Sequence, residues 1–412
     1  MRGLQTDLQI TGFATDELLA PEQALTLFFL RAQLLPRAVE TVPLESAAGR
    51  VLAGAVHADR DYPRAARSAM DGFALHSRDA GSGLRIAGEI RMGEAWPAQL
   101  APETALRIPT GGVLPPGADC VVPVEDAEVA GDRVRVKAMA AGENVVPAGS
   151  DMRAGELLLE EGRRIGSAEA AVLATLGIAD VRVYRTPVFA VLSSGDEIVE
   201  LRADPTIAQV RDSNRWAIAA KLQRLGAAVK HYPIAPDDEA AYGALLRAAV
   251  AECDGVALTG GSSVGLRDLT PKLVEACGPP GVIVHGIKVK PGKPTLLASA
   301  GGKPVIGLPG NPTSALMILE AVASPIVAQC VGTRIAAGGV QARLTAPVRK
   351  RAGWTHYVPV RLEEMGGVCT ALPLEMHSAS VSLLARASGF LTLGETVDSV
   401  AAGDMVWAAR FL

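Results

Sequence analysis

The pattern of hydrophobic and polar positions divides the chain near Pro187. Upstream, residues 60–149 hold many glycines, prolines and short apolar runs, which is typical of a small β domain. Downstream, short apolar runs alternate with segments of helical length. The apolar runs do not alternate in polarity, as expected for strands of a parallel sheet covered by helices on both faces. The sequence therefore predicts an α/β domain beyond Pro187.

The downstream half is predicted to be a regular series of strands and helices. We expect strands at residues 188–192, 229–234, 255–258, 282–289 and 305–308, and helices at residues 213–225, 237–252, 271–277 and from 312 through an apolar run to 327. Gly226 should end the first of these helices, because glycine readily adopts the left-handed conformation of a helix C-terminus. Ligands of such folds bind at the carboxyl ends of the strands, where this sequence places its glycines and charges.

The remaining parts are predicted to be mostly β structure with two helices. Helices are expected at residues 22–35 and 167–176, an extended segment at 41–59, and short strands at 84–90, 105–108, 120–124 and 133–137. Residues 332–339 form a predicted linker, and residues 340–412 return to short strands, which indicates a second small β domain.

Composition narrows the class of protein. A chain of 412 residues is too long for one hydrophobic core, so about two to four domains are expected. Its 49% hydrophobic and 20% charged residues are typical of a globular protein, and its 43 glycines and 27 prolines indicate many tight turns. The net charge of −4 argues against a nucleic-acid partner, which normally meets a basic face, so any anion site must be local.

The five cysteines (120, 253, 277, 330 and 369) are scattered and form no CxxC or Cys/His cluster. We therefore expect neither a disulfide framework nor a zinc site, and a reducing cytoplasm fits. Residues 1–15 lack the basic and then apolar order of a signal peptide. No run is expected to reach the ~18 apolar residues of a membrane span. The sequence predicts a soluble cytoplasmic protein that does not contact a membrane.

Two lysines, Lys290 and Lys293, flank a Pro-Gly turn. Proline fixes φ and glycine permits positive φ, so the turn is rigid and the ammonium groups project from it. After the next strand-like run, Asn311 is a good helix N-cap and Pro312 a good first helical residue. A helix N-terminus offers free N–H groups and partial positive charge. The segment thus predicts a site for a phosphorylated or oxyanion ligand, with an ordinary strand-to-helix turn as the alternative.

A second glycine-rich turn, residues 260–265, follows the strand that ends at Thr259. Its small residues let backbone N–H groups approach phosphate oxygens. It is neither a Walker loop, since no Gly-Lys-Ser/Thr follows, nor a dinucleotide fingerprint. Acidic residues recur at the same edge of the predicted sheet: Asp196, Glu197, Asp237, Asp238 and Asp268. Carboxylates beside anion-binding loops suit Mg²⁺, which bridges phosphates.

Each of these residues also has an ordinary structural explanation. Asp237 can cap a helix, Asp196 and Glu197 can belong to a solvated turn, and residues 212–215 can cap the helix that follows. His285 is favoured as a core or surface histidine over a ligand. Segments 68–72 and 109–115 would be interpreted as turns if each were considered alone.

In combination, these segments resemble the MoeA-type molybdopterin molybdenumtransferases, a family that includes the gephyrin E domain. The resemblance is carried by residues 68–72 (Ser-Ala-Met-Asp-Gly), 109–119, 124–126, 142–144, 149–151, 192–197, 212–215, 258–265, 290–294 (Lys-Pro-Gly-Lys-Pro) and 308–312 (Leu-Pro-Gly-Asn-Pro). The segments keep their order over nearly the whole chain, so the combination is far more specific than any one turn.

The resemblance implies a multidomain α/β plus β fold with four domains. Domain I is a linker domain of two segments, residues 1–45 and 150–186, and residues 46–149 form an inserted β domain II. Residues 187–332 form an α/β, parallel-sheet, molybdopterin-binding domain III, and residues 333–412 a C-terminal β-barrel domain IV. An elongated homodimer is also implied, with a cleft between domain III of one subunit and domain II of its mate.

The implied activity is Mg²⁺-dependent insertion of molybdate into adenylylated molybdopterin, which releases AMP and the molybdenum cofactor. A molybdopterin adenylyltransferase would supply the substrate, and acceptor molybdoenzymes would receive the product. The residues agree with so anionic a substrate, because glycine turns and lysines would hold its phosphates while carboxylates would hold Mg²⁺ and position water.

The resemblance assigns roles by position. Residues that match places important for activity are Asp71, Thr110, Asp151, Glu197, Asp237 and Asp268, of which Asp71 and Thr110 should reach across the dimer cleft. The predicted metal ligands are Asp196, Glu197 and Asp268. The predicted substrate contacts are Ser213, Gly260, Gly261, Ser262, Ser263, Gly265, Lys288, Lys290, Lys293, Pro309 and Asn311, with Lys290 expected on the oxyanion.

Three departures from the family pattern bear on turnover. A lysine is usual four residues before Lys290, where this chain has Gly286, and arginines are usual where it has Trp354 and Pro359. These losses remove positive charge from the expected molybdate path, although Lys288 and Arg361 lie nearby in sequence. The usual Ser-Gly-Gly is here Thr-Gly-Gly at residues 259–261. A catalytically weak molybdopterin carrier or scaffold is therefore the alternative function. A third possible function is the adenylylation of molybdopterin, the neighbouring step of the same biosynthesis. The β domains and the 68–72 motif argue against it.

Overall fold

The computed structural model describes residues 18–260, 264–335, 338–375 and 380–411. The chain forms two compact units. One unit takes in the described part of Met1–Ala53 together with Gly162–Gly166 and Asp180–Leu412, and the other takes in Gly54–Glu161 and Ser167–Ala179. The multidomain α/β plus β fold is thereby confirmed, while the exact four-domain boundaries stay a prediction.

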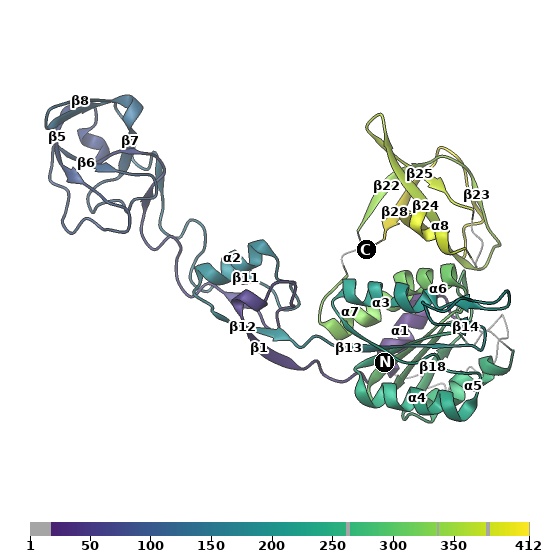
Figure 1. Ribbon diagram of the computed structural model, residues 1–412. Helices are drawn as coiled ribbons and strands as arrows, with labels where there is room; N and C mark the ends of the chain where they lie inside the picture. The colour runs from purple at the N-terminus through teal and green to yellow at the C-terminus, as the bar shows by residue number, and fades with distance from the viewer. Residues whose placement is uncertain (1–17, 261–263, 336–337, 376–379, 412) are drawn as a thin grey trace, which may run out of the picture. The chain divides into compact units, whose positions relative to one another are not determined.

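The larger unit is built on a sheet with the strand order β16-β13-β17-β21-β20-β18 (Figure 1). Its strands are β13 (Val188–Ser194), β16 (Ala228–His231), β17 (Gly255–Gly260), β18 (Pro280–His285), β20 (Leu296–Ala300) and β21 (Lys303–Leu308). Strands β16, β13, β17 and β21 run parallel, as the sequence predicts. Strand β20 is antiparallel to both of its neighbours, so one edge of the sheet is mixed.

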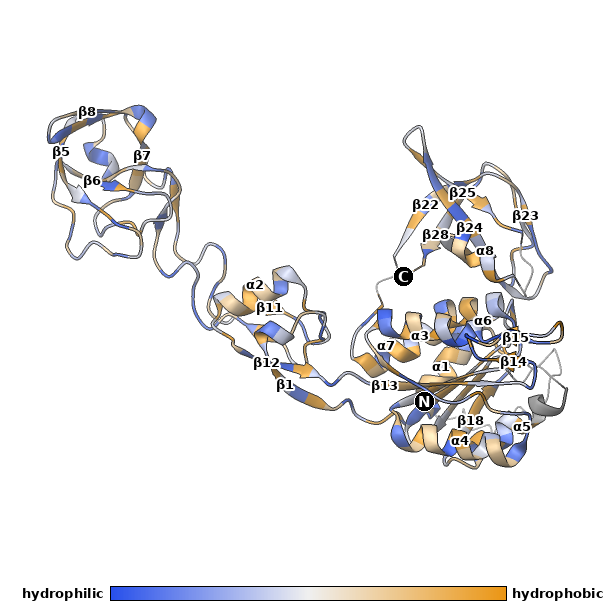
Figure 2. Cartoon of the chain, in the orientation of Figure 1, coloured by the Kyte–Doolittle hydropathy of each residue, from blue (hydrophilic) through white to orange (hydrophobic). Residues whose placement is uncertain are grey.

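Helices cover both faces of this sheet, because successive side chains of each strand point to opposite faces. Helices α1 (Pro21–Arg31), α3 (Ser213–Leu225), α6 (Pro312–Ile318) and α7 (Ser324–Val331) pack on one face, where Phe189 and Val191 are buried with Phe28. Helices α4 (Glu239–Glu252) and α5 (Val264–Glu275) cover the other face, where Ala190 and Leu192 are buried. Figure 2 shows both blue and orange turns on these helices, as expected for amphipathic helices.

The apolar segment Pro312–Val331 consists of α6, a π-helical turn (Leu319–Ala323) and α7. The segment has 20 residues and a mean hydropathy of 1.7, so it is long and apolar enough to cross a membrane. The expectation that no run reaches this length was therefore wrong. However, 67% of the segment is buried inside the molecule, as in the core helix of a soluble protein. The segment lies at the centre of the buried cluster on its face of the sheet.

Most helix ends follow from local residues. Helix α3 ends at Gly226, whose φ of +101° is left-handed as predicted. Helix α1 ends at Arg31, four residues early, because Gln33 has a φ of +47° and Pro36 follows. Helix α4 is capped by Asp238, whose carboxylate accepts the Ala241 N–H at 2.8 Å. Helix α5 is longer than the predicted 271–277 and keeps a proline inside it, since its buried residues override the local preference.

The predicted strand at 282–289 is divided in two at Gly286. Gly286 has a φ of +85°, which bends the chain out of β18. Strand β19 (Val289–Lys290) then pairs in parallel with β24 (Thr355–Met365) of the C-terminal barrel, with Lys290 opposite His356. The segment that carries the predicted oxyanion lysine is therefore held by the barrel.

The C-terminal region is a closed β barrel, as predicted. Its strands are β22 (Gly339–Leu344), β24, β25 (Val368–Pro373), β26 (Gly389–Leu393) and β28 (Met405–Arg410). The additional β24–β26 pairing closes the barrel. The short strands β23 (Val348–Arg349) and β27 (Ser399–Val400) pair beside it, and α8 (Val381–Arg386) is a helix that the sequence did not predict. Within the same unit, β1 (Val39–Pro43) pairs with β12 (Asp180–Tyr184).

The smaller unit contains a sheet with the order β7-β4-β6-β5-β9-β8. Its strands are β4 (Gly72–Leu75), β5 (Gly83–Glu89), β6 (Thr104–Ile108), β7 (Cys120–Pro123), β8 (Ala127–Ala130) and β9 (Arg133–Val136). Two further pairs, β3 (Arg67–Ser68) with β10 (Val145–Val146) and β2 (Val56–His57) with β11 (Leu157–Leu159), and helix α2 (Ser167–Thr175) complete it. The four predicted strands and the helix are confirmed.

Candidate functional site

Two adjoining pockets open at the carboxyl ends of β13, β17 and β21. The acidic pocket, of about 390 Å³, is lined among others by Ser193, Glu197, Asp212, Ser213 and Asn214. The tyrosine pocket, of about 120 Å³, is lined among others by Tyr242, Thr270, His285, Pro294 and Leu296. Both are also lined by Thr259, Gly260, Gly310 and Asn311. The pockets thus lie where α/β folds bind ligands.

Gly260 forms the wall between the ends of two strands. Its φ is +113°, and a Cβ on this residue would lie 2.1 Å from the carbonyl oxygen of Ser194. Because that oxygen belongs to the backbone of β13, no side chain can be accommodated without moving a strand. A glycine is therefore required here for β13 and β17 to end side by side.

The N-terminus of α3 is tied to the two other strand ends. Asp212 caps the helix by accepting the Arg215 N–H at 3.0 Å, as one of the sequence alternatives proposed. Asn214 does something that the sequence did not predict. Its Nδ2 donates to Thr259 Oγ1 and to the Gly310 carbonyl oxygen, both at 2.8 Å. A polar residue just after a cap, at the edge where strands end, was the available signal.

Several buried polar side-chain atoms at the acidic pocket have no hydrogen-bond partner in the described part of the chain. Two of them are Ser193 Oγ and Asn214 Oδ1, and Ser193 is only 2% exposed. A buried polar group left unsatisfied costs about 1–3 kcal/mol. Such groups in a native protein normally meet water or a ligand. Their position in this wall supports a binding role for the pocket.

Three carboxyl groups gather near the end of β13. The Asp237 N–H donates to Asp196 Oδ1 at 3.1 Å, and the residue that caps α4 is Asp238, not Asp237. Burial, followed by the charges of Asp196 and Glu197, raises the pKa of Asp237. Glu197 folds back over Gly195, where a Cβ would lie 2.5 Å from its Oε2. Within the described residues, no three potential ligands are already arranged around one metal position.

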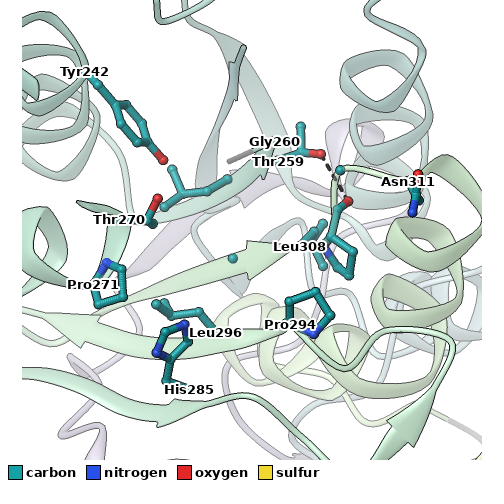
Figure 3. Close-up of a pocket in the computed structure, with 14 residues that line it drawn as sticks. Tyr242, Thr259, Gly260, Thr270, Pro271, His285, Pro294, Leu296, Leu308 and Asn311 are labelled. Atoms are coloured by element: carbon teal, nitrogen blue, oxygen red, sulfur yellow. Dashed lines mark hydrogen bonds between the residues drawn. The ribbon is translucent and has the colours of Figure 1, made fainter. Parts of the chain in front are cut away.

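The tyrosine pocket presents hydroxyl groups and apolar walls (Figure 3). The side chains of Tyr242 and Thr270 point toward one another, and His285 lies on the opposite wall beside Leu296. Burial raises the pKa of Tyr242. Hydrogen bonding with the hydroxyls of Thr270 and Ser194 lowers this pKa by a smaller amount. Tyr242 is therefore a neutral hydrogen-bonding group at ordinary pH.

The predicted helix start at Asn311 is present, but the predicted lysines do not line either pocket. Asn311 is the N-cap of α6 by its backbone, without a side-chain capping bond, and Pro312 is the first helical residue. Lys290 is exposed, and Lys288 Nζ lies 3.4 Å from Glu395 Oε2 of the barrel. Neither these lysines nor Lys293 are among the residues that line the pockets, whereas Pro309 is.

His356, opposite Lys290 in the β19–β24 pairing, is 9% exposed. Burial, assisted by the charges of Lys290 and Lys350, lowers the pKa of His356 to about 4. The imidazole is therefore neutral at pH 7 and adds no positive charge beside Lys290.

We expect His356 to make folding stability depend on pH. Because the folded protein takes up the proton only near pH 4 and the unfolded chain near pH 6.5, this histidine's contribution is intact above 6.5 and is lost as pH falls towards 4. The loss is at most ~3 kcal/mol. Urea denaturation at pH 7.5 and pH 4.5 should show a smaller pH effect for His356→Gln than for the wild type. The exposed His57→Gln is the control, and a wild-type response from His356→Gln would contradict the prediction.

The predicted residues of the smaller unit fall in two places. Asp71 Oδ1 accepts hydrogen bonds from the Thr110 N–H at 2.6 Å and the Thr110 hydroxyl at 2.8 Å. These bonds lower the pKa of Asp71 and keep it ionised. Asp151 lines a shallow surface pocket with Arg153 and Glu156. Asp71 and Thr110 therefore lie together, and their expected role across a dimer cleft stays a prediction.

Several predicted residues lie at or beyond the limits of the description. Gly261, Ser262 and Ser263 lie outside the described residues. Gly265 and Asp268 belong to α5, but their side chains are not part of the description. The roles predicted for these five residues stay predictions.

Comparison with known proteins decides the family. Residues 19–177 match the MoeA N-terminal region (domain I and II), 190–329 a probable molybdopterin binding domain, and 341–411 the MoeA C-terminal region (domain IV). The chain is 31% identical over 377 residues to a molybdopterin molybdenumtransferase of Synechocystis, covering 88% of this chain and 93% of that protein. The chain belongs to the MoeA family of molybdopterin molybdenumtransferases.

Further relatives agree with MoeA membership. The molybdopterin molybdenumtransferase of Haemophilus influenzae is 32% identical over 319 residues, which are 75% of this chain and 78% of that protein. A crystal structure of a MoeA protein of molybdopterin biosynthesis from Pyrococcus horikoshii matches with a TM-score of 0.81 and 32% identity, covering 96% of this chain and all of that one. This MoeA protein is therefore an enzyme of molybdenum cofactor biosynthesis.

Proposed function

We propose that this MoeA protein inserts molybdate into adenylylated molybdopterin in a Mg²⁺-dependent reaction, with release of AMP and formation of the molybdenum cofactor. The observation that carries the proposal is the pair of adjoining pockets, with Glu197 on one side, Tyr242 on the other, and Gly260 and Asn311 in both. A substrate made of two flat ring systems joined through phosphates has the extent and the polarity to occupy both.

The carboxyl groups fit a magnesium ion. Burial is the main cause of the raised pKa of Asp237, and the charges of Asp196 and Glu197 add to it. A divalent cation would relieve the repulsion among these carboxylates. Mg²⁺ is usually held by one or two carboxylates together with substrate phosphates and water, so a preformed set of three ligands is not required. Asp196 and Glu197 would hold the ion, which when bound neutralises charge on phosphate oxygens. The side chains on the chain itself bind and orient the substrate.

The proposal is tested with purified protein, adenylylated molybdopterin, molybdate and MgCl₂. We expect release of AMP that requires molybdate and matches the amount of molybdenum incorporated, and that stops on chelation of Mg²⁺. AMP release without incorporated molybdenum would contradict the proposal. Consumption of ATP in the presence of unmodified molybdopterin would instead support the adenylylation reaction.

A second candidate function is a molybdopterin carrier with weak catalysis. It is favoured by the absence of basic side chains at positions 286, 354 and 359, where the family usually has them. The chain has a left-handed φ of +85° at Gly286, where family members carry a lysine. The neighbours that could compensate are engaged elsewhere, Lys288 with Glu395 and Arg361 with Glu363 at 2.7 Å. Tight molybdopterin binding without AMP release in the same assay would support the carrier.

We further propose a cytoplasmic homodimer in which Asp71 and Thr110 of one subunit complete the site of the other. Separate Asp71→Asn and Glu197→Gln proteins should each be inactive. After unfolding and refolding of an equal mixture, half of the dimers are mixed and each holds one intact site, so about a quarter of wild-type activity should return. Recovery of no activity, with mixed dimers demonstrated by two affinity tags, would contradict a site shared between subunits.

Substrate supply and product delivery complete the proposal. A molybdopterin adenylyltransferase would provide the adenylylated pterin, and molybdoenzymes that accept the cofactor would take the product. The local acidic and hydroxyl groups of the pockets suit a small anionic molecule with its metal, and the net charge of −4 does not favour nucleic acid.

A further inference from the structure

Asn214 occupies a central place in the wall of the acidic pocket. It is the second residue of α3, and its partners are 45 and 96 residues further along the chain. Thr259 is the buried, next-to-last residue of β17, and Gly310 lies in the Pro-Gly-Asn turn after β21. One side chain therefore connects the start of α3, the end of β17 and the turn after β21.

The orientation of the Asn214 amide is fixed by chemistry. The Gly310 carbonyl can only accept a hydrogen bond, so the atom that faces it at 2.8 Å must be the NH₂ group. The same NH₂ group donates to Thr259 Oγ1, and that hydroxyl lies 3.5 Å from the Pro309 carbonyl oxygen, to which it can donate. Both donor hydrogens of the amide are thus used inside the protein.

The other half of the amide is left without a partner. Asn214 Oδ1 is buried and accepts no hydrogen bond within the described residues, and neither does the nearby pocket hydroxyl of Ser193, which is 2% exposed. An amide oxygen can only accept. A fully ionised phosphate or a tetraoxo anion carries acceptors alone, so it cannot satisfy this oxygen. A hydroxyl or a ring N–H can.

We propose that Asn214 is a positioning residue that clasps the end of β17 to the turn after β21, and that its free oxygen accepts a hydrogen bond from a hydroxyl or N–H group of the ligand. The inference rests on the proposed function, because it assumes that the acidic pocket receives the substrate. It places the sugar or heterocyclic part of the ligand, and not its phosphates, against Asn214. It also explains why threonine at 259 is compatible with the site, since serine and threonine supply the same hydroxyl.

The clasp is tested without any ligand by hydrogen exchange of the full-length protein. In Asn214→Ala and Thr259→Val, backbone amides around Thr259 and Gly310 should exchange at least about tenfold faster, since local opening becomes easier. Thr259→Ser keeps the hydroxyl and should exchange as the wild type does. Gln223→Ala, an exposed substitution on the same helix, is the matched control. The proposed clasp would be wrong if the backbone amides of Asn214→Ala exchanged as slowly as those of the wild type. It would also be wrong if Thr259→Ser and Thr259→Val exchanged at equal rates.

The role of the free oxygen is tested by calorimetry with two probes. AMP has hydroxyl and amine donors, whereas pyrophosphate has essentially only acceptors. Asn214→Ala should weaken AMP binding by about 30-fold and pyrophosphate binding by about threefold, while Thr259→Val should weaken both by about threefold. Equal losses for both probes in Asn214→Ala would overturn the assignment of the oxygen. Failure of the wild type to bind either probe would refute the proposed function, and the exchange measurement would still decide the clasp.

Discussion

Replacing Glu197 by glutamine should reduce AMP release at least about 100-fold, because under the proposed function it removes a carboxylate that would hold the magnesium ion, without a change of shape. Glu197 lines the acidic pocket, and its carboxylate lies against Gly195 at the end of β13. Its charge contributes to the raised pKa of Asp237. Glutamine keeps the volume and removes the charge, so the effect isolates electrostatics. The measurement is AMP release at saturating molybdate over a range of Mg²⁺ concentrations.

The control for this substitution is Asp204→Asn, on the loop between β14 (Ile198–Val199) and β15 (Val210–Arg211). The Asp204 side chain is fully exposed and lies 3.9 Å from Arg211, and it does not line the acidic pocket. It should leave turnover unchanged. The Glu197→Gln protein should still bind molybdopterin, since the tyrosine pocket is intact. Turnover by Glu197→Gln within about threefold of the wild type would remove Glu197 from the catalytic set.

Local signals account for the parts of the fold that the sequence predicts well. Gly226 ends α3 because only glycine adopts its φ of +101° at no cost, and Asp212 begins the same helix with its side-chain cap. The unalternating apolar run at 188–192 predicts β13 because both faces of that strand are buried. These properties depend on residues a few positions apart, so they are visible in one sequence.

Properties that depend on distant residues could not be predicted in the same way. The two hydrogen bonds of Asn214 span 45 and 96 residues, and the residues near 214 mark a polar position after a helix cap without indicating its partners. Strand β19 leaves the expected 282–289 strand because it pairs with Thr355 and His356 of the barrel. That pairing places Lys290 outside the lining of both pockets, whereas Glu197, Ser213, Gly260, Pro309 and Asn311 line them as expected. Tertiary pairing, not local preference, decided each case.

The largest expected effect on stability comes from a buried ion pair beside the site. Lys221 of α3 lies 2.5 Å from Glu320 of the π-helical turn, with side chains 9% and 10% exposed. Burial lowers the pKa of Lys221, and the charge of Glu320 opposes this. Glu320→Ala leaves the ammonium group without its counter-charge, so it should lower the free energy of unfolding by about 3–5 kcal/mol. Urea denaturation followed by circular dichroism measures the change.

Two comparisons separate burial from charge in this prediction. The double variant Lys221→Met with Glu320→Leu removes both charges and should be as stable as the wild type or more so. Glu363→Ala, which breaks the half-exposed pair with Arg361, should cost less than about 1 kcal/mol. A loss below about 1 kcal/mol for Glu320→Ala would mean that water solvates the ammonium group. The pair joins α3, which carries Asn214, to the Pro312–Val331 segment, whose N-cap is Asn311. We therefore expect Glu320→Ala also to loosen these two walls of the acidic pocket.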